Sequence, residues 1–286
     1  MNSELTSLIL EGGAMRGMFT CGILDVFLEH NISFAAAAGI SAGAVFGCNF
    51  KSRQIGRAIR YNKKYCSDPR YCSFRSLLTT GDLYGADFCY RELPDILDPF
   101  DRTAFRENPI RFYAGATDVA TGKCEYHLCE DGGEEDMRWF RASASMPLVS
   151  HVVEAGGRKL LDGGIADSVP IRYFESIGYE RNVVILTQPE GFVKTASRGQ
   201  VLLNVLMRKY PKLAQTMARR HEMYNETSAY ISQREKEGAA FVIRPPKALE
   251  MSRTEHDPVK LCHAYNTGRE EAERRLEELK AFLKAE

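Results

Sequence analysis

The feature that most constrains this chain is a tight turn between an apolar strand and an apolar helix. An apolar run from Ile32 to Ala38 leads into Gly39-Ile40-Ser41-Ala42-Gly43, and small apolar residues follow. Gly39 and Gly43 lack the Cβ atoms that would collide where strand and helix meet. In this context the G-x-S-x-G pattern is typical of a nucleophile elbow, which presents a serine hydroxyl above a helix N-terminus. Alone it also fits an ordinary loop, because glycine and serine are common turn residues.

A strand–helix–strand unit contains this turn. Residues 7–10 form a short apolar run that predicts a buried first strand. From Met15 to about His30, apolar residues recur on one helical face, and the second strand follows at 32–38. Three such elements in succession predict a βαβ unit, and therefore a parallel sheet with a right-handed crossover.

The turn after the first strand is rich in glycine and reads Gly12-Gly13-Ala14-Met15-Arg16-Gly17. A dinucleotide site is not favoured, because Ala14 replaces the second glycine of that fingerprint and residues 33–38 lack its acidic residue. The alternative is an oxyanion hole, in which free backbone N–H groups lie beside a nucleophile on the neighbouring strand. For Arg16 we expect that its guanidinium braces the loop through backbone carbonyls rather than acting as a charge.

A carboxylate follows another predicted strand. Residues 151–154 and 158–161 flank Ala155-Gly156-Gly157 and predict a hairpin, which ends in Asp162-Gly163-Gly164. Asp162 fits the start of an ordinary turn. It equally fits a general base for Ser41, with Gly163 and Gly164 allowing close backbone approach.

The rest of the chain alternates between strands and helices. We expect strands at 110–116, 124–128, 182–187 and 239–243, and helices at 137–145, 169–178, 201–236 and 257–286. This pattern predicts an α/β fold with a doubly wound, mainly parallel sheet between helices. We place a catalytic domain at residues 1–200 and a mostly helical C-terminal extension, packed on it, at 201–286.

Two stretches are harder to interpret. Residues 53–64 carry five basic side chains and predict a solvated helix face. Residues 71–90 have no clean period, as expected of a lid or substrate loop. This stretch offers an apolar patch for acyl chains near Ser41, unless its side chains pack in the core: Phe74, Leu77, Leu78, Leu83, Tyr84 and Phe88.

Composition narrows the functional classes. The 286 residues carry 38 basic and 38 acidic side chains, which argues against a general nucleic-acid binder. Eight cysteines without a C-x-x-C pair, and no signal-like N-terminus, predict reduced thiols in a cytoplasm. We expect no metal site at Cys66 with Cys72 or Cys124 with Cys129, no cofactor, and no membrane span.

Together these pieces resemble the patatin-like phospholipase family, in particular its small bacterial members. The resemblance spans about residues 5–179 and is carried by residues 11–17, 39–43 and 162–164, together with the small-residue segment 142–147. Two positions depart from the family pattern: Ala14 stands at the third glycine of the oxyanion loop, and Gly164 at a position where many members have alanine.

The resemblance implies an α/β sandwich and a serine–aspartate dyad without histidine. It implies that Ser41 is the nucleophile of a lipid acyl hydrolase and Asp162 its base, with oxyanion-hole residues Gly12, Gly13, Ala14, Arg16, Gly17 and Ala42. The expected partner is a lipid or acyl ester, reached as a dispersed monomer or by peripheral contact with the inner face of a membrane. Two alternatives stay open: an α/β-hydrolase-like Ser-Asp-His esterase, using one of the histidines that follow Asp162, and a non-catalytic acyl-lipid-binding protein.

Overall fold

The fold is built on a central sheet. The computed structural model describes residues 6–196 and 207–284. Its eight-stranded sheet has the order β5-β6-β3-β2-β1-β7-β8, and β4 also pairs with β3. The strands are β1 (Thr6–Leu10), β2 (Ala36–Ile40), β3 (Arg111–Asp118), β4 (Cys124–Cys129), β5 (Val153–Ala155), β6 (Arg158–Asp162), β7 (Arg181–Ile185) and β8 (Ala240–Ile243). Strands β3, β2, β1, β7 and β8 are parallel, whereas β4, β5 and β6 pair antiparallel.

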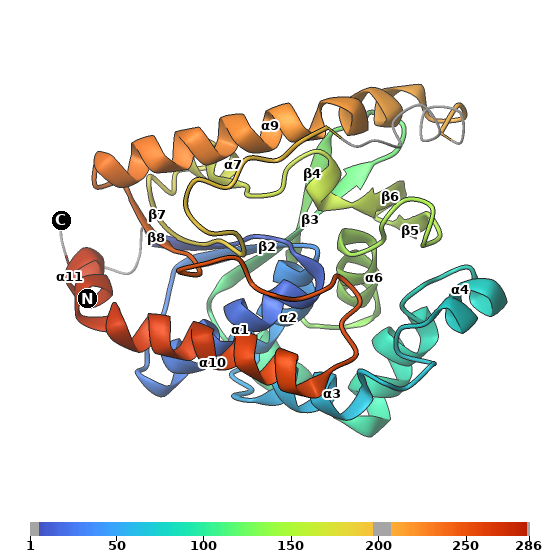
Figure 1. The fold of residues 1–286 in the computed structure, drawn as a ribbon, viewed down its shortest axis with the longest axis horizontal. Coiled ribbons are helices and arrows are strands. Elements are labelled where there is room, and N and C mark those ends of the chain that lie inside the picture. Colours follow the sequence, from blue (N-terminus) through green and yellow to red (C-terminus); the bar gives the residue numbers. More distant parts are fainter. Residues whose placement is uncertain (1–5, 197–206, 285–286) are drawn as a thin grey trace.

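Helices cover both faces of this sheet. They are α1 (Gly17–Glu29), α2 (Ala42–Lys51), α3 (Arg57–Tyr65), α4 (Phe74–Thr80), α5 (Arg102–Glu107), α6 (Glu134–Ser143), α7 (Ile171–Ser176), α9 (Pro211–Lys236), α10 (Pro258–Arg274) and α11 (Leu276–Lys284). Irregular helical segments are η2 (Ala14–Arg16), η3 (Phe88–Leu97) and η4 (Gly163–Ile165). Figure 1 shows α1, α2 and α10 on one side of the sheet and α7 and α9 on the other.

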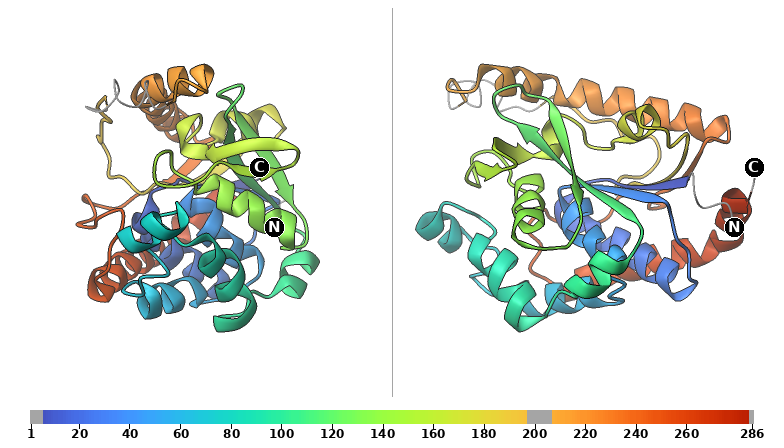
Figure 2. Two further views of the ribbon diagram at one scale, coloured as in Figure 1. Left: turned by 90° about the vertical axis from the view of Figure 1, so that its right-hand side faces the viewer. Right: turned by 180° about the vertical axis from the view of Figure 1, so that it is seen from behind.

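Strand alternation divides the core between these two layers. In β1, Leu8 and Leu10 face the cluster that contains Phe19 of α1, whereas Ile9 faces the cluster that contains Phe174 of α7. Both faces of a central parallel strand are buried in this way, which is why residues 7–10 read as a continuous apolar run. The two further views in Figure 2 show the same helix–sheet–helix arrangement. The predicted α/β fold class is confirmed.

The C-terminal part of the chain contributes to the sheet as well as to the helical layers. Strand β8 pairs parallel with β7 at the end of the sheet. Helix α10 packs along α1, where the Tyr265 hydroxyl donates to Asp25 Oδ2 at 2.6 Å and Arg269 pairs with Glu29 at 2.7 Å. The domain boundary at residue 200 stays a prediction.

Several predicted boundaries were wrong. The second strand begins at Ala36 rather than at residue 32, because pairing with β1 starts there; Ile32 and Phe34 are buried in the core outside any strand. Arg57 is not on a solvated face but is buried, with its guanidinium donating to Asn49 Oδ1 at 2.8 Å. Helix α9 begins at Pro211, and residues 201–206 of the predicted helix lie outside the described residues.

Candidate active site

Ser41 lies in the turn between β2 and α2, in a strained conformation. Its φ is 54° and its ψ −121°, a region that residues with a Cβ rarely occupy. The backbone N–H of Ser41 donates to the Ser143 hydroxyl at 2.8 Å, and that hydroxyl donates to the Gly115 carbonyl at 2.6 Å. Ser143, at the end of α6, therefore ties the turn to β3 and helps to hold the strained backbone.

Two glycines allow the elbow to form. A Cβ on Gly39 would lie 2.3 Å from the Gly43 carbonyl oxygen, and a Cβ on Gly43 would lie 2.4 Å from the Leu10 carbonyl oxygen. Both distances are shorter than a Cβ contact tolerates, so any larger residue would push strand and helix apart. The predicted reason for these glycines is thus the observed one, a close crossing of backbones.

The strand pairing of β3 places Asp162 close to Ser41. One edge of β3 pairs with β2 up to Ile40 opposite Gly115. The next residue, Ala116, pairs with Asp162 of β6. Strand β4 occupies the other edge of β3 over these same residues. Strand β6 therefore pairs with the same edge of β3 as β2 does, beyond the point where β2 ends. Asp162 therefore ends its strand directly beyond the point where β2 turns into the elbow.

The Asp162 carboxyl is buried, with 1% of the residue exposed. Its Oδ1 accepts from the Gly164 N–H at 2.8 Å, whereas Oδ2 is buried and has no hydrogen-bond partner of ordinary geometry among the described residues. Burial raises the pKa of this carboxyl, and the Arg220 charge and the nearby Ser41 hydroxyl oppose the rise. A carboxylate with a free oxygen, deprived of water beside a serine, is suited to accept a proton.

The glycine-rich loop brings backbone donors to the same place. The amides of Gly12, Gly13 and Ala14 donate no hydrogen bond within the described residues, and neither does that of Ala42, the first residue of α2. All four residues line one cavity with Ser41 and Asp162. Ala14 adopts φ 51°, a conformation that glycine reaches without strain, so the loop keeps its left-handed turn despite the extra methyl group.

Three other predicted site residues have different surroundings. Gly17 does not line the cavity, and its N–H is directed to the carbonyls of Ala14 and Met15, so it is not a free oxyanion donor. Gly163 packs against the backbone of Gly115, whereas Gly164 lines the cavity.

Arg16 also differs from its predicted bracing role. Its side chain makes no hydrogen bond among the described residues, and its Nε is buried without a partner. The residue lines the cavity instead.

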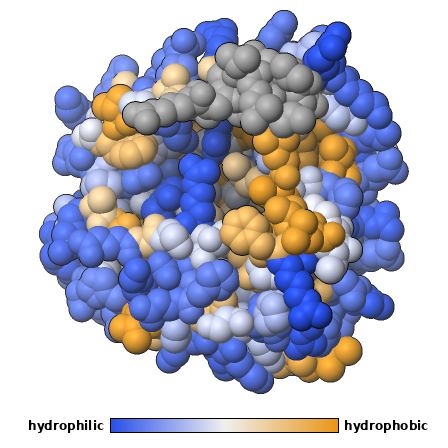
Figure 3. Space-filling view, turned by 45° about the vertical axis from the view of Figure 1, so that its right-hand side comes forward, coloured by the Kyte–Doolittle hydropathy of each residue, from blue (hydrophilic) through white to orange (hydrophobic). Residues whose placement is uncertain are grey.

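The cavity has a volume of about 600 Å³ and two kinds of wall. Apolar and aromatic side chains line one part: Val45, Phe46, Tyr61, Tyr71, Leu83, Tyr84 and Leu93. Charged side chains line another: Glu11, Arg16, Asp162, Lys194, Arg220 and Arg253. Figure 3 shows a face of the molecule that is hollowed near its centre, with hydrophobic residues gathered on one side and hydrophilic residues on the other.

The apolar residues of 71–90 lie in different places: some line the cavity, one is buried in the core and others are exposed. Leu83 and Tyr84 line the cavity, as expected of an acyl-binding surface. Phe88 is buried against Tyr65 and belongs to the core. Phe74 and Leu78 of α4 are 79% and 86% exposed and lie outside the cavity lining. Outside the core, the residues predicted to form one apolar patch therefore belong to two separate surfaces, the cavity lining and the exposed face of α4.

A family model described as patatin-like phospholipase matches residues 8–175, more than half of the chain. The matched segment contains the elbow, the glycine-rich loop and Asp162. The chain belongs to the patatin-like phospholipase family. Membership places it among lipid hydrolases.

Individual relatives of this patatin-like phospholipase are distant. The uncharacterised protein YjjU of Escherichia coli is 27% identical over 85% of this chain and 69% of its own length. Lysophospholipase NTE1 of Debaryomyces hansenii is 27% identical over 62% of this chain, which spans only 11% of that protein. The crystal structure of VipD from Legionella pneumophila aligns with a TM-score of 0.47 at 12% identity, covering 96% of this chain and 67% of VipD.

The patatin match ends before the C-terminal region. A second model, for a domain of unknown function (DUF6363), matches residues 210–284. This region nevertheless contacts the glycine-rich loop, because the Tyr224 hydroxyl of α9 donates to Glu11 Oε1 at 2.8 Å. Glu11 Oε2 in turn accepts from the backbone N–H of Thr187 at 2.5 Å. The loop is thereby anchored between β7 and α9.

Sequence reasoning missed the roles of Glu11, Thr187, Tyr224 and Ser143. A signal existed for Ser143, which lies in the quoted small-residue segment 142–147. Glu11 begins segment 11–17, which also carries the resemblance. No local pattern marks Thr187 and Tyr224, because their contacts join residues far apart in the chain.

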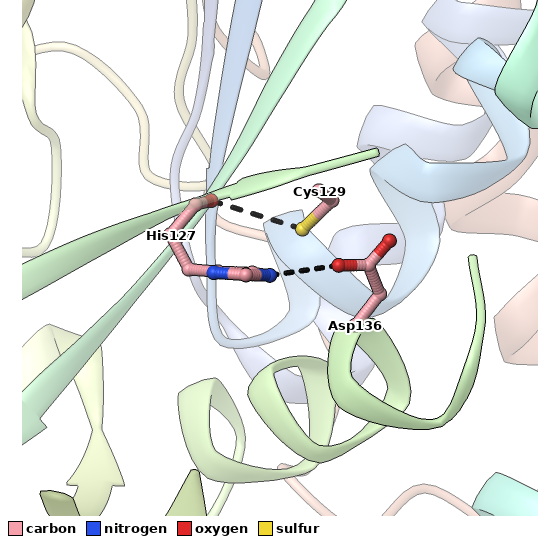
Figure 4. A group of neighbouring side chains, drawn as sticks. All are labelled: His127, Cys129 and Asp136. Carbon is pink, nitrogen blue, oxygen red and sulfur yellow. Dashed lines mark hydrogen bonds and ion pairs between the residues drawn. The ribbon is translucent and has the colours of Figure 1, made fainter. Parts of the chain in front are cut away.

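None of the six histidines, all of which lie in the described residues, lines the cavity. His127 Nε2 instead lies 2.7 Å from Asp136 Oδ1, next to Cys129 (Figure 4). Asp136 Oδ2 accepts from the backbone N–H groups of Asp131 and Gly132, and burial raises the pKa of the Cys129 thiol. These hydrogen bonds account for the cluster as a link between β4 and α6.

Proposed function

We propose that this patatin-like phospholipase is a serine esterase of lipid acyl groups, with Ser41 as nucleophile and Asp162 as general base. The observation that carries the proposal is the strand pairing of β3. Asp162 pairs with the residue of β3 that directly follows the last partner of β2, the strand that ends at the Ser41 elbow. The free amides of the glycine-rich loop and of Ala42 supply the oxyanion hole. No histidine is required, and none lines the cavity.

The reaction proceeds in two acyl transfers. Ser41 Oγ attacks the ester carbonyl carbon while its proton passes to Asp162 Oδ2, and the carbonyl oxygen becomes an oxyanion held by the amides. The C–O bond to the alcohol then breaks, and the departing alkoxide takes the proton from Asp162. Water attacks the acyl-serine, Asp162 accepts its proton, and the fatty acid leaves as Ser41 recovers its hydrogen.

A fluorophosphonate probe tests this proposal directly. We expect covalent phosphonylation of Ser41, found by peptide mass spectrometry, because fluoride is displaced only by an activated serine. Ser150→Ala, which changes another cavity serine, should leave labelling intact. A folded protein that takes no label would favour the non-catalytic acyl-lipid binder. Labelling that disappears in a single His→Ala variant would favour the Ser-Asp-His triad.

Membrane contact belongs to the same proposal. Among the described helices, none is both long and apolar enough to cross a bilayer. The eight cysteines, all in the described residues, are unpaired, which favours a reducing cytoplasm. The lipid is then reached at the inner face of a membrane or as a dispersed monomer.

Helix α4 offers a contact surface for lipid. Changing Phe74 and Leu78 together to serine should slow hydrolysis of vesicle-bound lipid by about tenfold or more, since burying one such side chain stabilises by about 1.5–3 kcal/mol. A soluble short-chain ester should be cleaved as before, and the melting temperature should hold, because both side chains are exposed. Val259→Ser, at an equally exposed site on α10, is the control. Equal losses on both substrates would contradict lipid contact by α4.

A further inference from the structure

The charged residues that line the cavity do not balance. Among the described residues that line it, four are basic (Arg16, Lys194, Arg220, Arg253) and two are acidic (Glu11, Asp162), so basic side chains outnumber acidic ones by two. The whole chain carries equal numbers of basic and acidic residues. The excess is therefore a local property of the cavity.

The two carboxylates do not pair with these cations. Glu11 is held by Thr187 and Tyr224. Asp162 accepts from the Gly164 N–H. Within residues 6–196 and 207–284, none of the four basic side chains forms an ion pair with an acidic one.

Hydrogen bonds nevertheless anchor three of these basic residues, through the side chain of Arg220 and through the backbones of Lys194 and Arg253. Arg220 Nε donates to the Gly164 carbonyl at 2.6 Å, which fixes the guanidinium beside the Asp162 loop. The backbone of Lys194 is clamped by Asn225, which accepts from its N–H at 2.8 Å and donates to its carbonyl at 2.9 Å. The Arg253 carbonyl accepts from the Tyr84 hydroxyl at 2.9 Å. A side chain held in place, as that of Arg220 is, loses little freedom when an anion binds.

Burial and the neighbouring positive charges both lower the pKa values of two of these cations, Lys194 and Arg16. Burial, followed by the charges of Arg220, Arg16 and Arg253, lowers the pKa of Lys194 to about 7. Burial also lowers the pKa of Arg16, and the charges of Arg253 and Arg220 add to this effect. The Nε of Arg16 is buried and has no acceptor among the residues that the structure describes. A bound anion would relieve both the repulsion and the missing hydrogen bond.

We propose that Lys194, Arg220 and Arg253, with Arg16, form an anion subsite that binds the phosphomonoester of an acylglycerol phosphate. This rests on the proposed function, because Ser41 must cleave the acyl ester of the same molecule. A phosphomonoester carries about 1.5–2 negative charges at pH 7, so it complements the excess of basic over acidic side chains in the cavity. A choline or ethanolamine headgroup adds a positive charge, which the neighbouring basic side chains would repel.

The positions of these basic residues in the chain give the C-terminal region a role in substrate binding. Lys194, Arg220 and Arg253 all follow the segment matched to the patatin family, and two of them lie in the domain of unknown function. Most of the aromatic lining comes from residues 45–93, and Met146, Val149, Phe192 and Val193 add further apolar side chains. In Figure 1, α9 and α3 lie on opposite sides of the sheet. Arg220 lies on α9 and Lys194 is held by Asn225 of the same helix, whereas the Arg253 carbonyl accepts from Tyr84 of the apolar lining. The phosphate site would therefore adjoin the acyl-binding surface.

The first test compares esters that share one acyl chain. We expect the wild type to cleave 1-oleoylglycerol 3-phosphate with a kcat/KM at least about tenfold above those for monooleoylglycerol and lysophosphatidylcholine. In the double variant Lys194→Gln/Arg253→Gln, the ratio of the phosphate ester to the neutral ester should fall about tenfold to a hundredfold, as expected for lost charged hydrogen bonds. Arg219→Gln, which removes an exposed charge of α9 outside the cavity, should leave the ratio unchanged.

A second test does not depend on catalysis. Titration calorimetry on Ser41→Ala should detect glycerol 3-phosphate, and more weakly inorganic phosphate, with both signals lost when Lys194→Gln/Arg253→Gln is added. Inorganic phosphate binding as tightly as glycerol 3-phosphate would mean a site for the free ion and would overturn the headgroup assignment. An unchanged substrate ratio in a folded double variant, or a preference for lysophosphatidylcholine, would overturn it as well. Phosphate binding without hydrolysis of any ester would reject the esterase and leave the anion subsite standing.

Discussion

Replacing Ser41 with alanine is expected to lower kcat for a p-nitrophenyl ester by at least about 10³-fold, because the attacking oxygen is removed. The fold should tolerate the change. Within the described part of the chain, no hydrogen bond of ordinary geometry is recorded for the Ser41 hydroxyl, and alanine can occupy the same positive φ at a similar cost. The bond from the residue 41 N–H to Ser143 is retained because it uses the backbone.

Two measurements check this expectation. Steady-state kinetics should show the loss, and thermal unfolding should show a melting temperature within about 2 °C of wild type, as for a change of about 0.5 kcal/mol. Residual activity of more than a few per cent in the purified variant would show that another residue is the nucleophile.

Asp162→Asn is expected to match Ser41→Ala in its loss of activity, because the two residues act as one unit and their effects are not additive. A general base typically contributes about 10²–10⁴-fold, and asparagine cannot accept the proton. The amide oxygen can still accept from the Gly164 N–H, so the local structure should persist. Single alanine variants of His151, His221, His256 and His263 serve as controls and should keep most activity.

The same substitution should not destabilise the protein. Burial raises the pKa of Asp162 above its ordinary value of 3.8, so the folded state disfavours the carboxylate. Above the folded pKa this buried charge costs stability relative to the unfolded chain, and the cost disappears as the pH falls through the folded pKa. Asparagine removes the cost at every pH, so the melting temperature at pH 7 should equal or exceed that of wild type.

The pH profile provides a further check on Asp162. The base is active as the carboxylate, so kcat/KM of the wild type should fall on acidification, with a midpoint above 3.8. An inactive Asp162→Asn variant with a markedly lower melting temperature would point to a structural role. An active one would exclude Asp162 as the base.

Much of the fold was predictable because short stretches of neighbouring residues indicate its strands, helices and turns. The apolar run at 7–10, the helical periodicity after Met15 and the turn at Gly39–Gly43 each arise from neighbouring residues, and their order predicted the parallel sheet that is observed. Strand boundaries were less accurate. Ile32 and Phe34 are buried without belonging to a strand, and an apolar pattern reports burial rather than hydrogen bonding.

The candidate site was predictable only in part. The amino-acid sequence alone determined the elbow and the glycine-rich loop, since tight turns and close backbone crossings demand particular residues at fixed spacing. It marked Asp162 as a carboxylate after a strand, yet not where that strand lies. Its assignment as the base stays a prediction.

Tertiary structure decided which distant residues meet. The register of β3 brings Asp162 to the end of β2, and Ser143, 102 residues from Ser41, braces the elbow. The proposed anion subsite combines Arg16 of the glycine-rich loop with Lys194, Arg220 and Arg253, which follow the segment matched to the patatin family. In the sequence these cations are indistinguishable from other surface charges. Their partners depend on strand register and helix packing, which join segments that no local pattern relates.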